Sequence, residues 1–260
     1  SSISADGPTF LGAAYAPFET SGQARNNLKL SVDSVRFNDR TSVLTKMDGI
    51  NRQIDGSGLM DGLDSFEQQA ASLVLGESQA AFDLKQEDPQ LVAKYGTGLG
   101  QQLLLARRLC EAGAGFVTIN YGGWDMHGNI AKSLTSRAPQ LDQGVAALLE
   151  DLHDRGMEKN VLLVITGEFG RTPKVNKGSG RDHWAPLSTL ALAGGGLRMG
   201  QTVGESAPKV DVPATTPVQP LDLLATVFHV LGIPQNLQYV NNSGRPVFIN
   251  TGGAPIAELI

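Results

Sequence analysis

Apolar residues recur at helical spacing through the first part of the chain. Stretches such as LMDGLDSFEQQAASLVL predict several short helices over 31–95, and a strong amphipathic helix is predicted over 97–112. Asp88 followed by Pro89 is typical of a helix N-terminus, where proline occupies the first helical position. Residues 1–30 are rich in Gly, Pro, Ser and Asn, which predicts an irregular lead-in over the surface of the fold.

From residue 113 onward, short apolar runs alternate with helical spacing. The runs predict strands over 115–121, 161–166 and 188–193, and the spacing predicts helices over 137–155 and 219–231. The apolar residues expected to face inward from the first of these helices are Leu141, Val145, Leu148, Leu149 and Leu152. This alternation is typical of an α/β fold in which a mostly parallel sheet is sandwiched by helices.

The length of 260 residues is sufficient for one large domain. We expect a single α/β domain over 1–260, with the lead-in at 1–30, a mainly helical part at 31–112 and the α/β core at 113–260. The net charge of −5 and the 41% of hydrophobic residues are typical of a globular protein.

Composition argues against several classes of partner. The sequence has no basic run, which argues against a nucleic-acid partner, and no apolar run near the roughly 18 residues of a membrane span. Cys110 is the only cysteine, so the chain forms no internal disulfide. Nothing in the sequence indicates an oligomeric state.

The segment GGWDMHGN at 122–129 places Asp125 and His127 two residues apart, directly after the predicted strand 115–121. In an extended backbone, residues i and i+2 share a face, so both side chains can approach one metal ion. The alternative is a polar loop in which Asp125 caps a turn.

A second polar loop, at 167–186, follows the predicted strand 161–166 and contains Glu168, Asp182 and His183. Loops at the carboxyl ends of parallel strands converge on one edge of the sheet. The two loops together offer carboxylates and imidazoles, a donor set that suits zinc, manganese or iron. The alternative for each residue is a structural role, such as a hydrogen-bonded pair of Asp182 and His183 within the loop.

The same loop carries residues suited to an anion. Arg171 and Arg181 can bind phosphate or sulfate oxygens bidentately, and Asn176 can assist as a neutral donor. Arg171 could instead pair with Glu168, and Asn176 could simply be a solvated loop residue.

These motifs carry a resemblance to a known family. The run from LGAAYAPF at 11–18, through AFDL, LLLARRLCEAG, GGWDMHGN, GEFGRTPKVN and GRDHW, to LAGGG at 192–196 resembles the bacterial family DUF1501. That family is similar to the alkaline phosphatase and sulfatase superfamily. The resemblance covers nearly the whole chain.

The resemblance implies a metal site. Asp125 and His127 resemble a pair of ligands to the first metal of the superfamily, and His183 resembles the remaining histidine. Glu168 occupies the place of the acidic residue in the Asp-His-Gly motif of the second metal, but Phe169 stands where that motif has histidine. The resemblance therefore implies that the first site is retained and the second is altered.

The upstream loop that bears the nucleophile in similar proteins has no counterpart in the sequence. Either the chain is a fragment of a longer protein, or its chemistry proceeds without a covalent step. In the second case a water activated by the metal could attack directly, with Asp182 or Glu168 as general base. Similar proteins commonly carry a twin-arginine export signal, which implies a periplasmic or secreted location.

The sequence thus predicts a hydrolase of phosphate or sulfate esters that requires a divalent metal, zinc or manganese, and acts on a small-molecule or saccharide ester. Two alternatives remain open. One is a serine carboxylesterase in which Ser78, within GESQA at 76–80, acts as nucleophile with His183 or His229 as its partner. The other is a member of the fold that binds a metal or anion without turnover.

Overall fold

The computed structural model describes residues 16–20, 35–36, 39–40, 42–43, 78–241 and 243–260. Most of the lead-in and short helices predicted before residue 78 lie outside these ranges. The chain divides into two compact units: Ser1–Asp83, Glu111–Ala114 and Val240–Arg245 form the smaller, and Leu84–Cys110, Gly115–Tyr239 and Pro246–Ile260 form the larger. The single domain expected over 1–260 stays a prediction.

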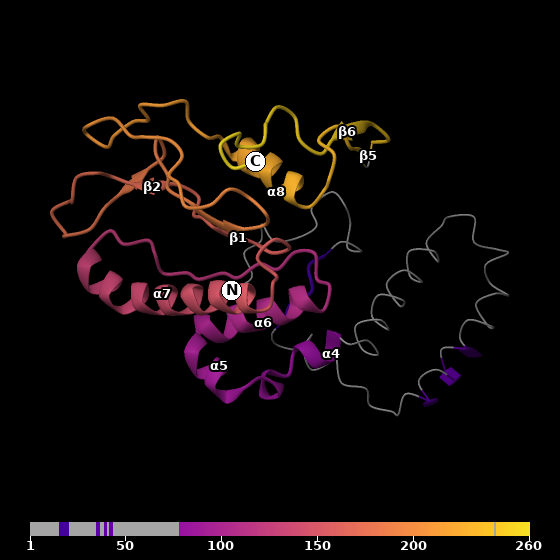
Figure 1. Ribbon diagram of the computed structural model, residues 1–260. Coiled ribbons are helices and arrows are strands. Elements are labelled where there is room, and N and C mark those ends of the chain that lie inside the picture. The colour runs from indigo at the N-terminus through magenta and orange to yellow at the C-terminus, as the bar shows by residue number, and fades with distance from the viewer. Residues whose placement is uncertain (1–15, 21–34, 37–38, 41, 44–77, 242) are drawn as a thin grey trace. The chain divides into compact units, whose positions relative to one another are not determined.

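Helices account for most of the regular structure in the described residues (Figure 1). They are α4 at Ser78–Ala81, η4 at Leu84–Gln86, α5 at Pro89–Tyr95, α6 at Leu99–Glu111, α7 at Ile130–Asp154 and α8 at Pro220–Val230. Asp88 caps α5 as predicted, because its carboxylate accepts the Gln90 amide at 2.8 Å and Pro89 stands at the first helical position. None of the described helices is both long and apolar enough to cross a membrane.

Helix α7 begins seven residues before its predicted start, directly after the GGWDMHGN segment. It continues through Pro139, although proline removes one backbone donor within the helix. Asn129 occupies the N-cap position in the left-handed conformation, at φ 48°, and its side chain makes no capping hydrogen bond. Asp125 and His127 therefore lie within a short connection that ends on a long helix.

The described strands form three two-stranded sheets. They are β1 at Leu162–Ile165 with β4 at Ala191–Gly194, β2 at Gly170–Arg171 with β3 at His183–Trp184, and β5 at Gln238–Val240 with β6 at Pro246–Phe248. The β1–β4 and β2–β3 pairs are antiparallel. The mostly parallel sheet stays a prediction. Residues 115–121 do not form the predicted strand in the described structure, since their backbone makes no ladder hydrogen bonds there.

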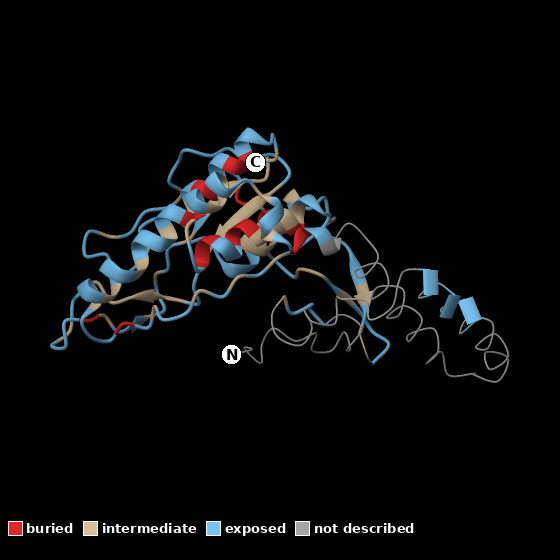
Figure 2. Cartoon of the chain, turned by 90° about the horizontal axis from the view of Figure 1, so that it is seen from below, coloured by how far each residue is buried: buried red, intermediate tan, exposed pale blue. Residues whose placement is uncertain are grey.

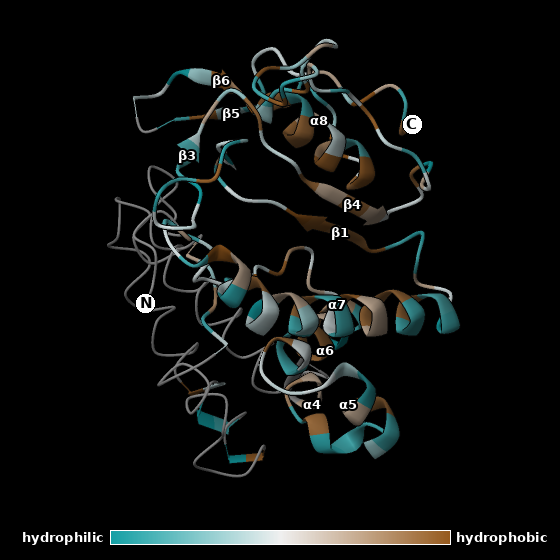
Figure 3. Ribbon diagram, turned by 90° about the vertical axis from the view of Figure 1, so that its left-hand side faces the viewer, coloured by the Kyte–Doolittle hydropathy of each residue, from teal (hydrophilic) through white to brown (hydrophobic). Residues whose placement is uncertain are grey.

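Within the larger unit, the β1–β4 pair lies between two layers of helix. Figures 1 and 3 show α8 on one side of the pair and α7 with α6 on the other. The strand β1, LLVI, is wholly apolar, as a strand covered on both faces should be. The apolar run at 161–166 therefore predicted the strand β1 correctly.

The core of the larger unit is built mainly from helices, and most residues coloured as buried in Figure 2 lie on them. The buried cluster consists of Tyr95, Leu99, Leu103, Leu104, Ala147, Leu148 and Leu152. Leu149, predicted to face inward, is 36% exposed. The buried face of this helix consists of Gly144, Ala147, Leu148, Asp151 and Leu152, and Leu149 lies beyond the edge of that face.

A glycine allows α6 and α7 to pack closely. A Cβ at Gly144 of α7 would lie 2.9 Å from Leu103 Cδ1 and 3.3 Å from the Gly100 Cα of α6. Neither distance leaves room for a side chain at this crossing. The close approach brings the polar groups at the other end of the same interface into contact.

That interface contains a buried network of charges. Arg107 is 1% exposed, and its guanidinium contacts Asp151 Oδ2 and Glu87 Oε1, both at 2.8 Å. Asp151 also accepts hydrogen bonds from Tyr95 at 2.9 Å and from Arg155 at 2.7 Å. The network therefore links Glu87, just before α5, and Tyr95, the last residue of α5, with α6 and the end of α7.

The network keeps its acidic members ionised. Burial alone would raise the pKa of Asp151, but hydrogen bonds from Arg155 and Tyr95 and the charge of Arg107 lower it overall. Burial opposes ionisation of Glu87 in the same way, and hydrogen bonds from Arg107 and Arg108 lower its pKa overall. A group with a pKa lowered in the folded state stabilises the fold above its ordinary pKa.

We expect Asp151→Asn to lower the free energy of unfolding by about 3 kcal/mol, because it leaves Arg107 buried without its full counter-charge. Urea denaturation measures this loss. Glu150→Gln is the matched control, since the adjacent Glu150 pairs with Lys94 on the surface with side chains 58% and 46% exposed. The control should change the free energy by less than about 1 kcal/mol, and equal losses in both variants would contradict the role of the network.

The pH dependence of stability should reflect the same groups. The unfolded chain binds protons at Asp151 and Glu87 at a higher pH than the folded chain does, so stability falls as the pH drops below about 5. In Asp151→Asn one of these carboxylates is missing. Denaturation across pH 2 to 7 should therefore show a shallower acid loss than in the wild-type chain.

Candidate metal centre

Two elements bring the candidate ligands together. Asp125 and His127 lie in the connection that ends at α7, and His183 lies on β3. The β2–β3 pair places Arg171 directly across from His183. The candidate ligands expected from the two polar loops therefore lie on two segments, the connection that leads into α7 and the β2–β3 hairpin.

Backbone contacts fasten these two elements to each other. The amides of Asn129 and Ile130 donate to the carbonyls of Gly178 and Ser179 at 3.0 and 2.9 Å. In return, the Arg181 amide donates to the carbonyl of Met126 at 3.0 Å. These bonds use donors at the N-terminus of α7 that have no partner inside the helix.

Gly180 permits this close approach. It is buried, and a Cβ at this position would overlap the carbonyl of His127 and the amide of Gly128. The neighbouring Gly178 is less constrained, because its Cβ would lie 3.4 Å from the His127 carbonyl oxygen. The loop glycines thus have different roles, and only the structure distinguishes them.

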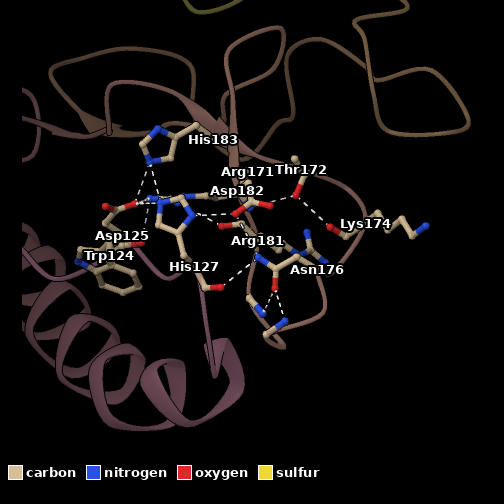
Figure 4. A network of polar contacts seen from close by, with 12 residues as sticks. Trp124, Asp125, His127, Arg171, Thr172, Lys174, Asn176, Arg181, Asp182 and His183 are labelled. Atoms are coloured by element: carbon tan, nitrogen blue, oxygen red, sulfur yellow. Dashed lines mark hydrogen bonds and ion pairs between the residues drawn. The ribbon is translucent and has the colours of Figure 1, made fainter.

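Three donor atoms converge on one point in the site (Figure 4). Asp125 Oδ1 lies 2.9 Å from both His127 Nε2 and His183 Nε2, and the two imidazole nitrogens are 3.1 Å apart. Within the described part of the chain, this is the one group of three or more His, Cys, Asp or Glu side chains with ligand spacing.

The triangle has the dimensions of a face of a metal coordination sphere. Two ligand atoms about 2.1 Å from one ion are about 3.0 Å apart at a right angle and about 3.4 Å apart at the tetrahedral angle. The three observed edges of 2.9, 2.9 and 3.1 Å match the first value. The spacing of the three donor atoms is therefore compatible with one shared ion.

Proton positions support the same conclusion. His127 Nδ1 lies 2.8 Å from Asp182 Oδ1, and a carboxylate only accepts, so Nδ1 carries the hydrogen. In a neutral imidazole, His127 Nε2 then presents a lone pair to Asp125 Oδ1, which also has only lone pairs. This neutral form of the His127 ring is the one that can ligate a metal.

The site is partly open and its carboxylates are ionised. The side chains of Asp125, His127 and His183 are 64, 47 and 50% exposed. Hydrogen bonds from His183 and Arg171 lower the pKa of Asp125 to about 2. Hydrogen bonds from His127 and Asn176 lower the pKa of Asp182.

The two arginines of the loop differ in their contacts. Arg171 donates to Asp125 Oδ1 at 2.6 Å, to the carbonyl of Trp124 at 3.4 Å and to the carbonyl of Arg181 at 3.2 Å. Arg171 therefore uses its guanidinium N–H groups mainly for hydrogen bonds within the protein. The Arg181 side chain makes no hydrogen bond or ion pair to other described residues.

Glu168 and Asn176 do not take the places that the sequence suggested. Glu168 is exposed and does not belong to the cluster of three ligands, and the expected pairing of Arg171 goes to Asp125 instead. Both amide hydrogens of Asn176 are used inside the protein, by Asp182 and the His127 carbonyl. This occupation argues against Asn176 as an anion donor.

Aromatic rings border the ligands. The Phe169 ring lies 4.3 Å from the His183 ring, centroid to centroid. Trp124 is half-buried beside Asp125 and packs edge to face on Tyr121, with the ring centroids 5.7 Å apart. These rings cover part of an otherwise open site.

Ser78 is the first residue of α4 and belongs to the smaller unit. A nucleophile elbow requires a strand immediately before the serine. That strand would fall on residues outside the described ranges, so the serine-esterase alternative stays a prediction.

The sequence missed the pairing of Asp182 with His127 and the packing role of Gly180. One weak signal for this pairing was the adjacency of Asp182 and His183. In an extended segment neighbouring side chains point to opposite faces, so the two residues would not be expected to pair with each other. The glycines of GSGRDH also marked a close backbone approach. Neither signal identifies His127 as the partner of Asp182, because His127 lies in a loop about 55 residues earlier.

We expect Gly180→Ala to lower the free energy of unfolding by about 1–3 kcal/mol, because the added methyl group forces the two loops apart. Urea denaturation measures the loss, and limited proteolysis of the 176–181 loop should accelerate.

Gly178→Ala is the matched control two residues away, where an added methyl group meets only ordinary contacts. It should change the free energy of unfolding by less than about 1 kcal/mol. If both glycine variants were equally stable, the proposed backbone contact would not be the constraint.

Comparison with known proteins identifies a family but no characterised relative. The family described as "Protein of unknown function (DUF1501)" matches residues 2–260. No curated protein and no solved structure is significantly similar to the chain. Because the family match spans almost the whole sequence, the chain belongs to the DUF1501 family.

Proposed function

We propose that this protein is a metal-dependent hydrolase of phosphate or sulfate esters, related to the alkaline phosphatase and sulfatase superfamily. The observation that carries the proposal is the convergence of Asp125 Oδ1, His127 Nε2 and His183 Nε2 within 3.1 Å of one another. Two imidazoles and a carboxylate form a donor set suited to zinc or manganese.

Asp125, His127 and His183 would hold the ion. When bound, a divalent metal supplies a Lewis acid that polarises an ester oxygen and favours attack by water. Arg171 keeps Asp125 ionised and oriented through its 2.6 Å contact. In this proposal the protein directs three donor atoms toward one ion and leaves the opposite side of that ion open to the substrate.

Arg181 is the residue proposed to bind the charged oxygens of the ester. It lies two residues before His183 in the same loop, and its guanidinium has no described protein partner. Guanidinium groups match the geometry of phosphate and sulfate oxygens. Lys174 and Lys177 are exposed in the same loop and add positive charge for an anionic substrate.

The proposed site holds one ion. Phe169 packs on His183 and stands in the sequence where the resemblance implies a second-metal histidine, and phenylalanine has no donor atom. The half-exposed ligands favour a substrate whose ester group protrudes, such as a small-molecule or saccharide ester. On the resemblance alone, which implies a twin-arginine export signal, we propose a periplasmic or secreted location.

We expect the purified chain to bind one zinc or manganese ion, as measured by elemental analysis and calorimetric titration. Asp125→Ala, His127→Ala and His183→Ala should each weaken binding by more than about 100-fold, beyond the range for groups outside the ligand set. Hydrolysis of phosphate or sulfate esters should fall in parallel.

His153→Ala is the matched control, because His153 is an exposed histidine of α7 outside the ligand cluster. It should retain the metal and the activity. A chain that binds no metal contradicts the proposal, and one that binds metal without cleaving any ester in a broad screen favours a binding role. Ester cleavage that disappears in Ser78→Ala with the metal content unchanged would favour the serine esterase.

Arg181→Gln should raise KM for the ester about 10-fold, the effect of losing one charge-assisted hydrogen bond of about 1.5 kcal/mol. Metal content should not change, because Arg181 is not a ligand. Arg198→Gln removes an exposed arginine outside the site and should leave KM unaltered. Steady-state kinetics with both variants tests whether Arg181 binds the ester oxygens. An unchanged KM in Arg181→Gln would exclude this role.

A further inference from the structure

The proposed ligand His127 has a second polar face that points away from the cluster. Its Nδ1 donates to Asp182 Oδ1 at 2.8 Å, while Nε2 faces Asp125 and His183 (Figure 4). Because an ionised carboxylate only accepts, this hydrogen bond fixes both the tautomer and the plane of the ring. A carboxylate behind a ligating histidine also increases the basicity of the nitrogen that binds the metal.

Asn176 holds that carboxylate in place. Its Nδ2 donates to Asp182 Oδ1 at 3.1 Å and to the His127 carbonyl at 3.0 Å. Its Oδ1 accepts the amides of Gly178 and Gly180 at 2.9 and 3.0 Å. A reversed amide would face two acceptors with its oxygen and two donors with its nitrogen, so the orientation is determined by its four partners.

The backbone of Asp182 is also anchored. Its amide donates to Thr172 Oγ1 at 3.2 Å, and its carbonyl accepts the Thr172 amide at 2.9 Å. Both hydrogen bonds to the carboxylate end on Oδ1, so this oxygen is committed to His127 and Asn176.

We propose that Asp182 and Asn176 are positioning residues that hold His127 with its Nε2 lone pair directed at the metal. This inference rests on the proposed metal site. Asp182 sets the tautomer and the ring plane, and Asn176 fixes Asp182 and the His127 backbone to the same loop. The expected effect of removing such a partner is about a 10- to 100-fold loss of metal affinity with the ligands intact.

The first test is metal affinity in the full chain, measured for Zn²⁺ by competition with a chromophoric chelator. Asp182→Ala should weaken binding about 10- to 100-fold yet still reach one ion per chain at saturation. Asp182→Asn should recover part of the affinity, because the amide oxygen still accepts from His127 Nδ1. Asn176→Ala should weaken binding as well, and His127→Ala should weaken it most.

Asp142→Ala is the matched control. It removes an exposed carboxylate from α7, outside the site, and should leave the affinity unchanged. With Co²⁺ as the probe, the visible absorption bands should shift in Asp182→Ala and return toward the wild-type position in Asp182→Asn. A general loss of stability would not produce this pattern.

The second test needs no metal. Long-range ¹H–¹⁵N correlation spectra report the tautomer of each histidine, and the chain has four, which single variants can assign. In the metal-free protein His127 should carry its hydrogen on Nδ1, and Asp182→Ala should move it to Nε2 or produce a mixture. His153 provides an internal reference whose tautomer should not change.

The outcomes are distinct. If the wild-type chain binds no Zn²⁺ or Co²⁺, the proposed function fails, and the His127 tautomer alone decides whether Asp182 positions the ring. If metal binds but Asp182→Ala and Asp182→Asn leave both the affinity and the tautomer unchanged, the positioning role is wrong while the metal site stands. Loss of affinity together with the tautomer change supports both.

Discussion

The candidate site depends on the close backbone contact between the entry to α7 and the 176–181 loop. Gly180 lies against the carbonyl of His127 without space for a side chain, and hydrogen bonds run between the two segments in both directions. These contacts bring His183 to Asp125 and His127, although the sequence separates them by more than 50 residues. A donor set with spacing near 3 Å requires such rigidity, because a small displacement of either loop would separate the atoms.

A second constraint stabilises the helix that carries one of these loops. The buried network of Arg107, Asp151 and Glu87 joins the C-terminal end of α7 to α6 and to the segment before α5. At the N-terminal end of α7, the amides of Asn129 and Ile130 donate to the carbonyls of Gly178 and Ser179 in the loop. The helix is therefore held at both ends by polar contacts and along its length by packing, and this arrangement makes it a firm support for the ligands.

Structural features that depend on neighbouring residues in the sequence were easier to predict than features that depend on distant segments. The cap at Asp88 and the bounds of α6 and α8 depend on neighbours within one helical turn, and the sequence predicted them closely. The start of α7 was harder to predict, because its first turn is stabilised by Gly178 and Ser179 from a distant loop. Leu149 was assigned inward from its hydrophobicity, whereas the helical period placed Gly144 and Asp151 on that face.

The chemical groups of the candidate site can be read directly from the sequence: a carboxylate and a histidine at i and i+2, a later histidine, and arginines close to it in the loop. Which of these groups meet became clear only from the folded chain. Asp182 contacts His127, the Asn176 amide is used inside the protein, Arg171 pairs with Asp125, and Glu168 lies outside the cluster. Hydrogen bonds between side chains form or fail over distances of a few tenths of an ångström, and these distances are set by backbone packing between segments that are far apart in the sequence.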